Sequence, residues 1–248
     1  SMFWGNQTVS QLTGDWRDAR EFSERGLDAS RADQRILGNQ VLLEYGEGKV
    51  EDGDELLETL VGIRMPNQLN IGYLVCSFIV PLASLQTGNT LSLERAREVA
   101  QIGVSSSSPP LLTVMARSGL ALIAIIENDV VAAREHYDAL HPYQGILVPN
   151  CAGCTVDRLL GLLSRSMGNT SQAVEHFENA LAFCRMASYR PELAWTCFEY
   201  AETIETRNAD GDRTRTMSLL EESLSISTEV GMIPLMERAL SMQELLKS

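Results

Sequence analysis

The segment from Asp157 to Leu181 constrains the fold more than any other, because it holds two amphipathic helical patterns joined at Gly168-Asn169. The first pattern contains a large-small pair, Leu160-Gly161. In the second pattern, residues at helical spacing form one apolar face: Ala173, Phe177, Ala180 and Leu181. Small side chains at such positions let two helices approach closely, and glycine favours a tight turn between them. The segment therefore predicts an antiparallel helix hairpin.

Parts of this pattern recur along the chain. Equivalent positions on the predicted second helices are Ala96, Ala132, Ala173 and Thr216. They lie 36, 41 and 43 residues apart, which is longer and less regular than the about 34 residues of a tetratricopeptide unit. No segment shows the alternation of a strand. We therefore predict an all-α fold: a single domain over residues 3–248, built as a tetratricopeptide-like α-solenoid of about six antiparallel helix hairpins with a C-terminal capping helix.

Local signals place several helix boundaries. Asp33 is a suitable N-cap for a helix that runs to about residue 47, and glycines after it suggest that the partner helix spans residues 55–63. Pro81 is expected to kink an apolar helix. Near the end of the chain, Gly231 fits a helix C-cap and Pro234 fits the first turn of the capping helix.

The charge of the chain argues against two classes of partner. The formal net charge is −13, and the two lysines, Lys49 and Lys247, belong to no basic cluster. Nucleic acids and anionic membrane surfaces both select basic patches, so we expect this chain to bind neither. The longest apolar run, residues 71–85, is interrupted by Pro81 and is shorter than the about 20 residues of a membrane span. It is interpreted as a buried helix.

Cysteine usage indicates the compartment. The chain has five cysteines, an odd number, and three of them lie within helical patterns as small apolar residues: Cys76, Cys184 and Cys197. A secreted disulfide framework needs paired cysteines in a short chain rich in loops. We therefore expect a reducing, cytoplasmic location.

The other two cysteines form a C-x-x-C motif, Cys151 and Cys154, in a predicted loop that spans residues 141–155. Such a motif can lower the pKa of a thiol or supply half of a zinc site. A zinc site would need two more ligands, and the nearby histidines are His136 and His141. A thiol-based redox or zinc sensor is therefore an alternative function, beside the simpler interpretation that these are loop cysteines. No cofactor is otherwise expected.

Nothing in the sequence assembles a catalytic site. The phosphate-binding G-x-x-x-x-G-K-[ST] loop does not occur, and no pattern brings serine, histidine and aspartate together. His136 and His176 lie in helical patterns on separate units and are interpreted as surface or packing residues. We therefore expect a protein that is not an enzyme.

A binding surface is a better candidate for the functional site. In a stack of helix hairpins, the first helices line a concave face that can accept an extended peptide or a partner helix. Arg158 and Arg165 are seven residues apart on one side of such a helix, and arginines bind carboxylates through charge-assisted hydrogen bonds. They are our candidate partner-binding residues for an acidic segment; the alternative is a solvated arginine pair.

Three stretches between residues 174 and 242 carry a family resemblance: HFENALAFCR, RPELAWTCFEYAE and LLEESLSISTEVGMIPLMERAL. This region resembles the C-terminal helical-repeat arm of bacterial LuxR-type ATPase transcriptional regulators and of class III adenylate cyclases. In those families, nucleotide hydrolysis, cyclase activity and DNA binding belong to other domains. The resemblance thus implies a regulatory or sensory arm that binds protein or peptide and the adjoining domains of its parent. Ala19, Gly26 and Leu27 have the same relative spacing as Ala173, Ala180 and Leu181 on the second helix, so we expect more chain before them in the parent protein.

Overall fold

A computed structural model describes residues 2–30, 33–64, 70–105, 109–149, 153–207, 209 and 211–247. Within these ranges the regular structure is helical, apart from one isolated antiparallel bridge between Leu147 and Thr155. The helices are α1 (Met2–Thr13), α2 (Trp16–Ala29), α3 (Gln34–Gly46), α4 (Val50–Gly62), α5 (Ile71–Thr87), α6 (Leu93–Ser105), α7 (Pro110–Glu127), α8 (Val130–Leu140), the 3-10 helix η1 (His141–Tyr143), α9 (Val156–Ser166), α10 (Thr170–Ala187), α11 (Arg190–Arg207), α12 (Asp212–Val230) and α13 (Ile233–Lys247). The all-α prediction is confirmed.

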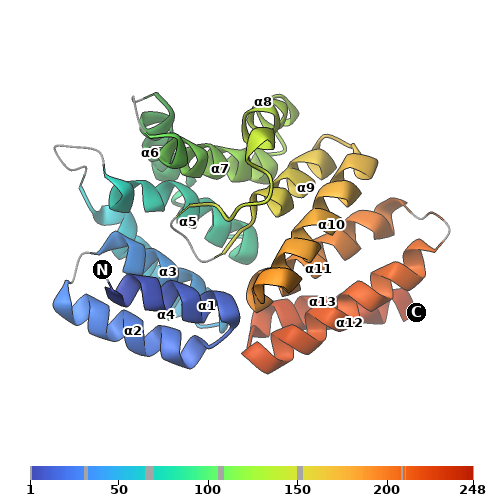
Figure 1. Cartoon of the computed structure of the whole chain (residues 1–248), viewed down its shortest axis with the longest axis horizontal. Helices are drawn as coiled ribbons and strands as arrows, with labels where there is room; N and C mark the ends of the chain where they lie inside the picture. The colour runs from blue at the N-terminus through green and yellow to red at the C-terminus, as the bar shows by residue number, and fades with distance from the viewer. Residues whose placement is uncertain are drawn as a thin grey trace.

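Consecutive helices pack against each other in pairs, from α1 with α2 to α11 with α12, and α13 packs on α12. The first helices of successive pairs also touch, so that α3 contacts α5, α5 contacts α7, and α7 contacts α9. The pairs follow one another around an arc (Figure 1).

The two ends of the arc meet. Helix α1 contacts α11, and α3 contacts α13, as the neighbouring blue and red helices show (Figure 1). The contact is close: a Cβ atom on Gly14 would lie 2.9 Å from Val230, and one on Gly48 would lie 3.6 Å from Ile233. We call this junction the seam.

Several predicted helix ends are confirmed. The Asp33 side chain accepts a hydrogen bond from the Arg35 amide, and Gly231 ends α12 in the left-handed conformation. The predicted start of α4 at residue 55 is wrong, because the helix begins at Val50 and contains Gly53. The ring of Tyr45 covers that glycine, and a Cβ atom there would lie 2.6 Å from the ring. Gly53 therefore permits helix packing and does not interrupt the helix.

Helices α5 and α7 are the apolar centre of the fold. Their closest approach is at Gly119, where a Cβ atom would lie 1.9 Å from the Ser77 carbonyl oxygen. Among the described helices, α7 alone has the length and apolar composition of a membrane span, but 61% of that window is buried inside the protein. Such burial is typical of a core helix. Pro81 lies inside α5 and is itself buried.

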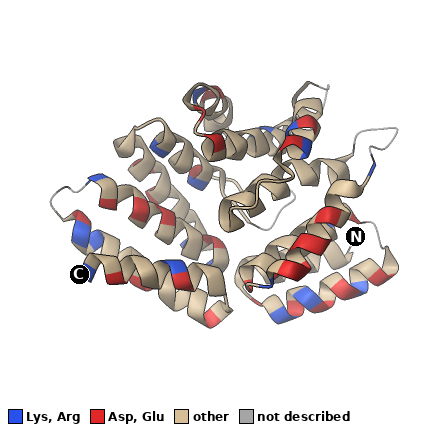
Figure 2. Cartoon of the chain, turned by 180° about the vertical axis from the view of Figure 1, so that it is seen from behind, with Lys and Arg blue, Asp and Glu red and all other residues tan. Residues whose placement is uncertain are grey.

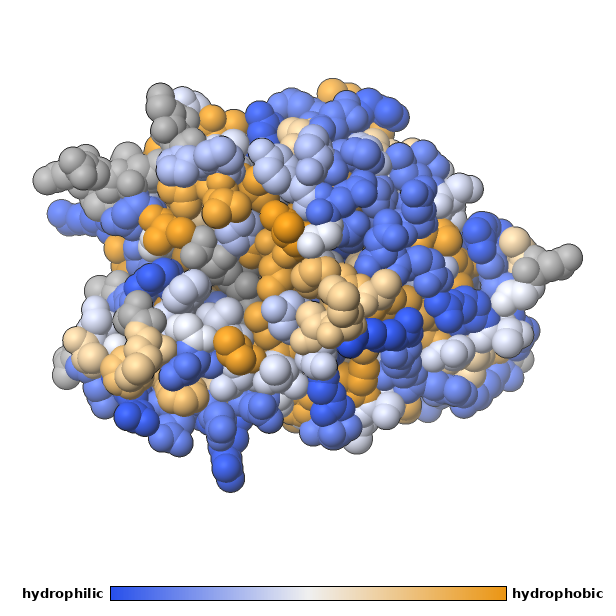
Figure 3. Space-filling model, viewed as in Figure 1, coloured by the Kyte–Doolittle hydropathy of each residue, from blue (hydrophilic) through white to orange (hydrophobic). Residues whose placement is uncertain are grey.

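Charged residues are distributed unevenly over the surface. Helix α2 carries both signs, whereas the α4 sequence contains five carboxylates and no lysine or arginine; both helices are visible from behind (Figure 2). On the opposite face, hydrophobic residues gather between the two ends of the arc and hydrophilic residues surround them (Figure 3).

Candidate functional site

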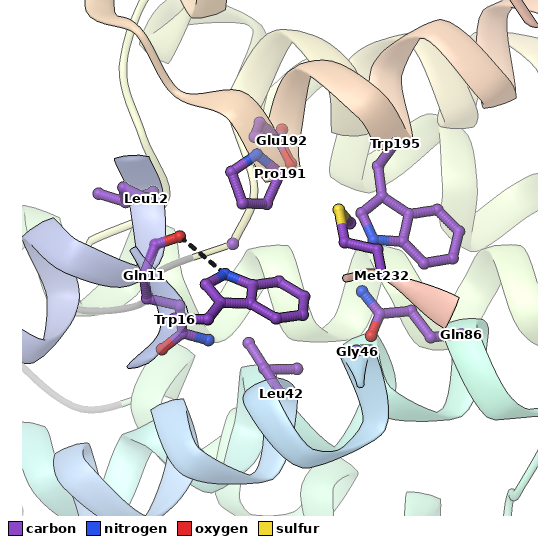
Figure 4. A pocket seen from close by; sticks show the side chains of 11 residues that line it. Gln11, Leu12, Trp16, Leu42, Gly46, Gln86, Pro191, Glu192, Trp195 and Met232 are labelled. Carbon is purple, nitrogen blue, oxygen red and sulfur yellow. Dashed lines mark hydrogen bonds between the residues drawn. The ribbon is translucent and has the colours of Figure 1, made fainter. Parts of the chain in front are cut away.

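A small cavity lies in the seam. Trp16 of α2 is at its centre, between Pro191 of α11 and Leu42 of α3, with Trp195 farther along the same space (Figure 4). The Trp16 indole nitrogen donates to the carbonyl oxygen of Gln11 at 3.3 Å, which fixes the ring. The cavity volume is about 30 Å³, enough for about one or two water molecules. This part of the seam is therefore almost completely packed.

A larger pocket of about 440 Å³ adjoins this cavity. The two share Gly46, Gln86, Trp195 and Met232. The remaining lining residues come from both ends of the arc: Tyr45, Gly48, Val50, Asp54, Thr87, Asn89, Ile233, Pro234, Leu235 and Glu237. We call this space the seam pocket. Its volume is within the range of small-molecule sites.

Asp54 organises one wall of the seam pocket. Its Oδ1 accepts hydrogen bonds from the Tyr45 hydroxyl at 2.6 Å and from the Asn89 amide at 3.3 Å. Burial, together with this hydrogen bond and the Asp54 charge, raises the pKa of Tyr45. The Tyr45 hydroxyl therefore stays protonated and donates to Asp54.

A buried ionic cluster lies between α9 and α11. The Arg158 guanidinium donates to Glu199 from Nε at 2.7 Å and from Nη2 at 2.8 Å, and it donates to Glu192 from Nη1 at 2.7 Å. The Arg158 side chain is 0% exposed, and both glutamates are almost fully buried. Two parallel bonds to one carboxylate are the strongest arrangement available to arginine.

The ionic cluster lies in the interior of the protein, where burial disfavours the charged forms of its side chains. Burial alone lowers the pKa of Arg158, but the charges of Glu192 and Glu199 outweigh that effect and keep the pKa well above its ordinary value. Burial raises the pKa of Glu192, against the opposing effect of Arg158. One arginine thus compensates two carboxylates, and the cluster depends on all of its hydrogen bonds.

The same cluster attaches the loop before α9 to α11. Glu192 accepts from the Thr155 amide at 2.6 Å and from the Thr155 hydroxyl at 3.1 Å, and Arg158 donates to the Gly153 carbonyl at 3.3 Å. A Cβ atom on Gly153 would lie 3.2 Å from Leu42. The loop therefore reaches α3 across the inner side of the arc, where Figure 1 shows it crossing the centre.

The prediction that Arg158 is exposed to a partner is wrong, because its guanidinium is enclosed and fully engaged by glutamates of α11. Arg158 and Arg165 do share one side of α9, as the seven-residue spacing predicts. That side faces α11, and Arg165 bonds Glu202 at 3.2 Å. Opposite charges thus alternate between the helices in the order Glu192, Arg158, Glu199, Arg165, Glu202 and, from α13, Arg238. We call this series the charge ladder.

Arg165 lies at the accessible end of the ladder, with 32% of its side chain exposed. It lines a groove of about 680 Å³ formed by the C-terminal ends of α5, α7 and α9. The other lining residues are Ser84, Leu85, Gly88, Thr90, Ile125, Ile126, Asn128, Leu162 and Ser166. Arg165 is the sole charged member of this set. We call this space the α5–α7–α9 groove.

The C-x-x-C motif is only partly described, since Cys151 lies outside the described residues. Cys154 is 0% exposed. The three helical cysteines are buried as predicted, and burial raises the pKa of each, to about 11 for Cys76. The described residues contain no group of three or more histidine, cysteine or carboxylate side chains placed to hold a metal ion.

The structure brings together two histidines that the sequence analysis treated separately. Tyr137 Oη lies 2.8 Å from His176 Nε2, and the rings of His141 and His176 are 6.0 Å apart. His176 Nδ1 is buried and has no hydrogen-bond partner among the described residues. Burial lowers the pKa of His176 and of His136. His136 and His176 are buried. They are therefore packing residues and not surface residues.

Sequence reasoning missed the charge ladder and the seam. Glu192 and Glu199 are seven residues apart, as Arg158 and Arg165 are. This equal spacing on two predicted helices could have indicated that the glutamates pair with the arginines. No such signal marks the seam, which joins the two ends of the arc. No protein-family model and no curated protein matches the chain.

Proposed function

We propose that this chain is a non-catalytic helical-repeat module that binds a protein or peptide. In this proposal the six helix pairs and α13 form a tetratricopeptide-like solenoid with a capping helix. The module acts in the cytoplasm as the regulatory or sensory arm of a larger bacterial signalling protein, either a transcriptional regulator or an adenylate cyclase. The resemblance of residues 174–242 to such arms supports this role.

The observation that carries the proposal is the α5–α7–α9 groove. Its lining contains apolar side chains such as Leu85, Ile126 and Leu162, and Arg165 is the one charged side chain among the described residues that line it. Capping amides already bond many of the last carbonyl groups of these helices, such as Ser84 with Gly88, Ile125 with Asn128 and Arg165 with Gly168. Recognition in the groove therefore rests on its apolar lining and on the Arg165 guanidinium. An arginine beside an apolar lining suits a peptide that combines apolar side chains with an acidic one.

Charge balance at the groove favours an acidic partner. Glu202 is shared by two arginines, Arg165 at 3.2 Å and Arg238 at 3.8 Å. Arg165 therefore has capacity for a second carboxylate at its exposed edge. Of the two arginines on this side of α9, only Arg165 belongs to the proposed site, because Arg158 is buried.

Site-specific photo-cross-linking in source cells tests the groove. A photoreactive residue at Leu85 should cross-link to a peptide with acidic and apolar side chains, from an adjoining domain or another protein. The matched control is Met186, which is 80% exposed on α10 outside the groove. Arg165→Glu should reduce the Leu85 cross-link about tenfold or more, since a charged hydrogen bond is lost and repulsion added. Equal cross-linking at Leu85 and Met186, or no effect of Arg165→Glu, would contradict the proposal.

The size of the native polypeptide tests the regulatory role. An antibody against this segment should detect a band far above 27.3 kDa in source cells, and peptide sequencing of that band should identify an effector domain. A band near that mass would instead make the protein a free-standing adaptor, and would remove the role of an arm.

A further inference from the structure

The seam pocket has a lining that selects for charge. Asp54 and Glu237 contribute carboxylates, and none of the described residues that line the space is a lysine or arginine. Asp54 belongs to α4, whose sequence adds four more carboxylates and no basic residue. The local electrostatic potential is therefore negative, which favours a cation and disfavours an anion.

The carboxylate of Asp54 is held ready for a ligand. Both of its hydrogen bonds, from Tyr45 and Asn89, go to Oδ1. Among the described residues Oδ2 has no donor, so it is the acceptor that remains for a ligand on the pocket wall. Because Tyr45 is 3% exposed and fixed against Gly53, the carboxylate does not have to be ordered when a ligand binds, which lowers the entropic cost of binding.

The rest of the lining is mostly apolar, with Gln86, Thr87 and Asn89 as its polar side chains. Trp195, Met232 and Leu235 are each less than a tenth exposed and form its packed base, whereas Val50 and Ile233 keep accessible apolar surface, at 51% and 46% exposure. A bare metal ion would leave this wall without a partner, and a pure hydrocarbon would leave the carboxylates without one. The arrangement of one fixed carboxylate and an apolar wall suits a small molecule with a positive end and an apolar body.

From this geometry we propose that the seam pocket binds a small organic amine, with its ammonium group on Asp54 and its apolar body against the accessible side chains of Val50 and Ile233. The exposed carboxylate of Glu237 adds attraction at the pocket edge. This site goes beyond peptide binding in the groove, because no residue lines both spaces.

Ligand binding here also stabilises the closed arc. The pocket wall combines α3, α4 and α5 on one side with α11 and α13 on the other. A ligand that touches both sides binds the closed arrangement in preference to an open one, and so shifts the population toward closure. The seam pocket is thus a means by which a small molecule regulates the shape of the module.

The test uses calorimetry and thermal unfolding of the whole chain with matched probes. Phenethylamine and tryptamine are each compared with the carboxylate of the same body, 3-phenylpropionate and indole-3-propionate. The amines should bind and raise Tm, and the carboxylates should not. Asp54→Asn should weaken amine binding about tenfold or more, because the ion pair is lost while an amide oxygen still accepts from Tyr45.

The control is Asp52→Asn, the same substitution on the same helix at an exposed residue outside the pocket. It should leave amine affinity unchanged, and both variants should keep the ligand-free Tm of the original chain. Glu237→Gln should weaken binding by a smaller factor than Asp54→Asn. The proposal is overturned if neither amine binds better than its carboxylate, or if Asp52→Asn and Asp54→Asn weaken binding equally.

Discussion

At Gly119, α7 approaches α5 so closely that a Cβ atom would lie 1.9 Å from the Ser77 carbonyl oxygen, whereas between α9 and α11 the whole side chain of Arg158 is enclosed with two glutamates. Each contact joins the first helices of two successive helix pairs. The α5–α7 contact is made by two backbones with small side chains between them, and the α9–α11 contact is made by long charged side chains.

The two contacts should therefore tolerate different kinds of substitution. The α5–α7 contact depends on shape, because a closely packed interior has no space for added atoms. The α9–α11 contact depends on charge balance, because removing one partner leaves a buried ion without compensation. Four substitutions distinguish these dependences, beginning with the largest expected effect.

Arg158→Met should produce the largest loss, about 3 to 5 kcal/mol in the free energy of unfolding, because two buried carboxylates lose their cation. Urea denaturation followed by circular dichroism measures the loss. The triple variant Arg158→Met, Glu192→Gln, Glu199→Met removes the charges but keeps an oxygen acceptor for the Thr155 amide. It should recover much of the stability. A triple variant that is less stable than Arg158→Met would show that the ions stabilise the fold beyond their mutual compensation.

Gly119→Ala should lower the free energy of unfolding by about 1 to 3 kcal/mol, since the added methyl group must displace the backbone of α5. The same denaturation measurement applies. The matched control is Gly5→Ala in α1, where a Cβ atom meets nothing within 4 Å. That change should stabilise the protein by about 0.5 to 1 kcal/mol because alanine favours the helix. Equal effects at the two glycines would disprove the close approach of α5 and α7.

Acid should destabilise the protein in part through His176, a buried residue of α10. Burial lowers the folded-state pKa of this residue below its usual 6.5, and the nearby His141 adds to that shift while Asp157 and Glu175 oppose it. As pH falls below about 6.5, the unfolded chain binds the proton first, so stability decreases. Tm should fall less steeply from about pH 7 to 5.5 in His176→Gln. Parallel Tm curves would exclude this contribution, since both proteins share all carboxylates.

Arg165→Gln should have the smallest effect on stability, below about 1 kcal/mol, because its pair with Glu202 is about one-third exposed on each side. The pair has the same chemistry as Arg158 with Glu199, so the comparison isolates the effect of burial. The difference from the original chain should vanish in high salt. A loss as large as that of Arg158→Met would show that the accessible end of the charge ladder is as critical as its buried end.

The helices could be predicted because their signals are local. The Asp33 cap, the Gly231 end and the apolar spacing around Phe177 all act within one or two turns of the chain. The start of α4 was predicted too late because glycine can either interrupt a helix at a turn or make room for a neighbouring side chain within a helix. At Gly53 it makes room for Tyr45, and only the packed structure distinguishes this use from a turn.

The candidate site was less predictable, because exposure is not a local property. Arg158 has the sequence context of a surface arginine, yet Glu192 and Glu199 lie 34 and 41 residues farther along the chain and enclose it. Arg165, seven residues later on the same helix, remains at the edge of a groove. Arg158 and Arg165 differ in exposure because α11 packs against α9 at Arg158. The spacing of residues within α9 does not predict where that contact falls.

By itself, the sequence determined the helical content, the pairing of consecutive helices and the acidic character of the chain, since these follow from periodicity, turn residues and composition. The tertiary structure alone decided that α1 meets α11 and α3 meets α13, that a loop crosses the inner side of the arc, and that a pocket forms at the seam. The physical reason is that the position of the two ends depends on every helix pair between them. Small rotations between successive helix pairs add up along the whole chain, and their sum, rather than any local signal, places the two ends together.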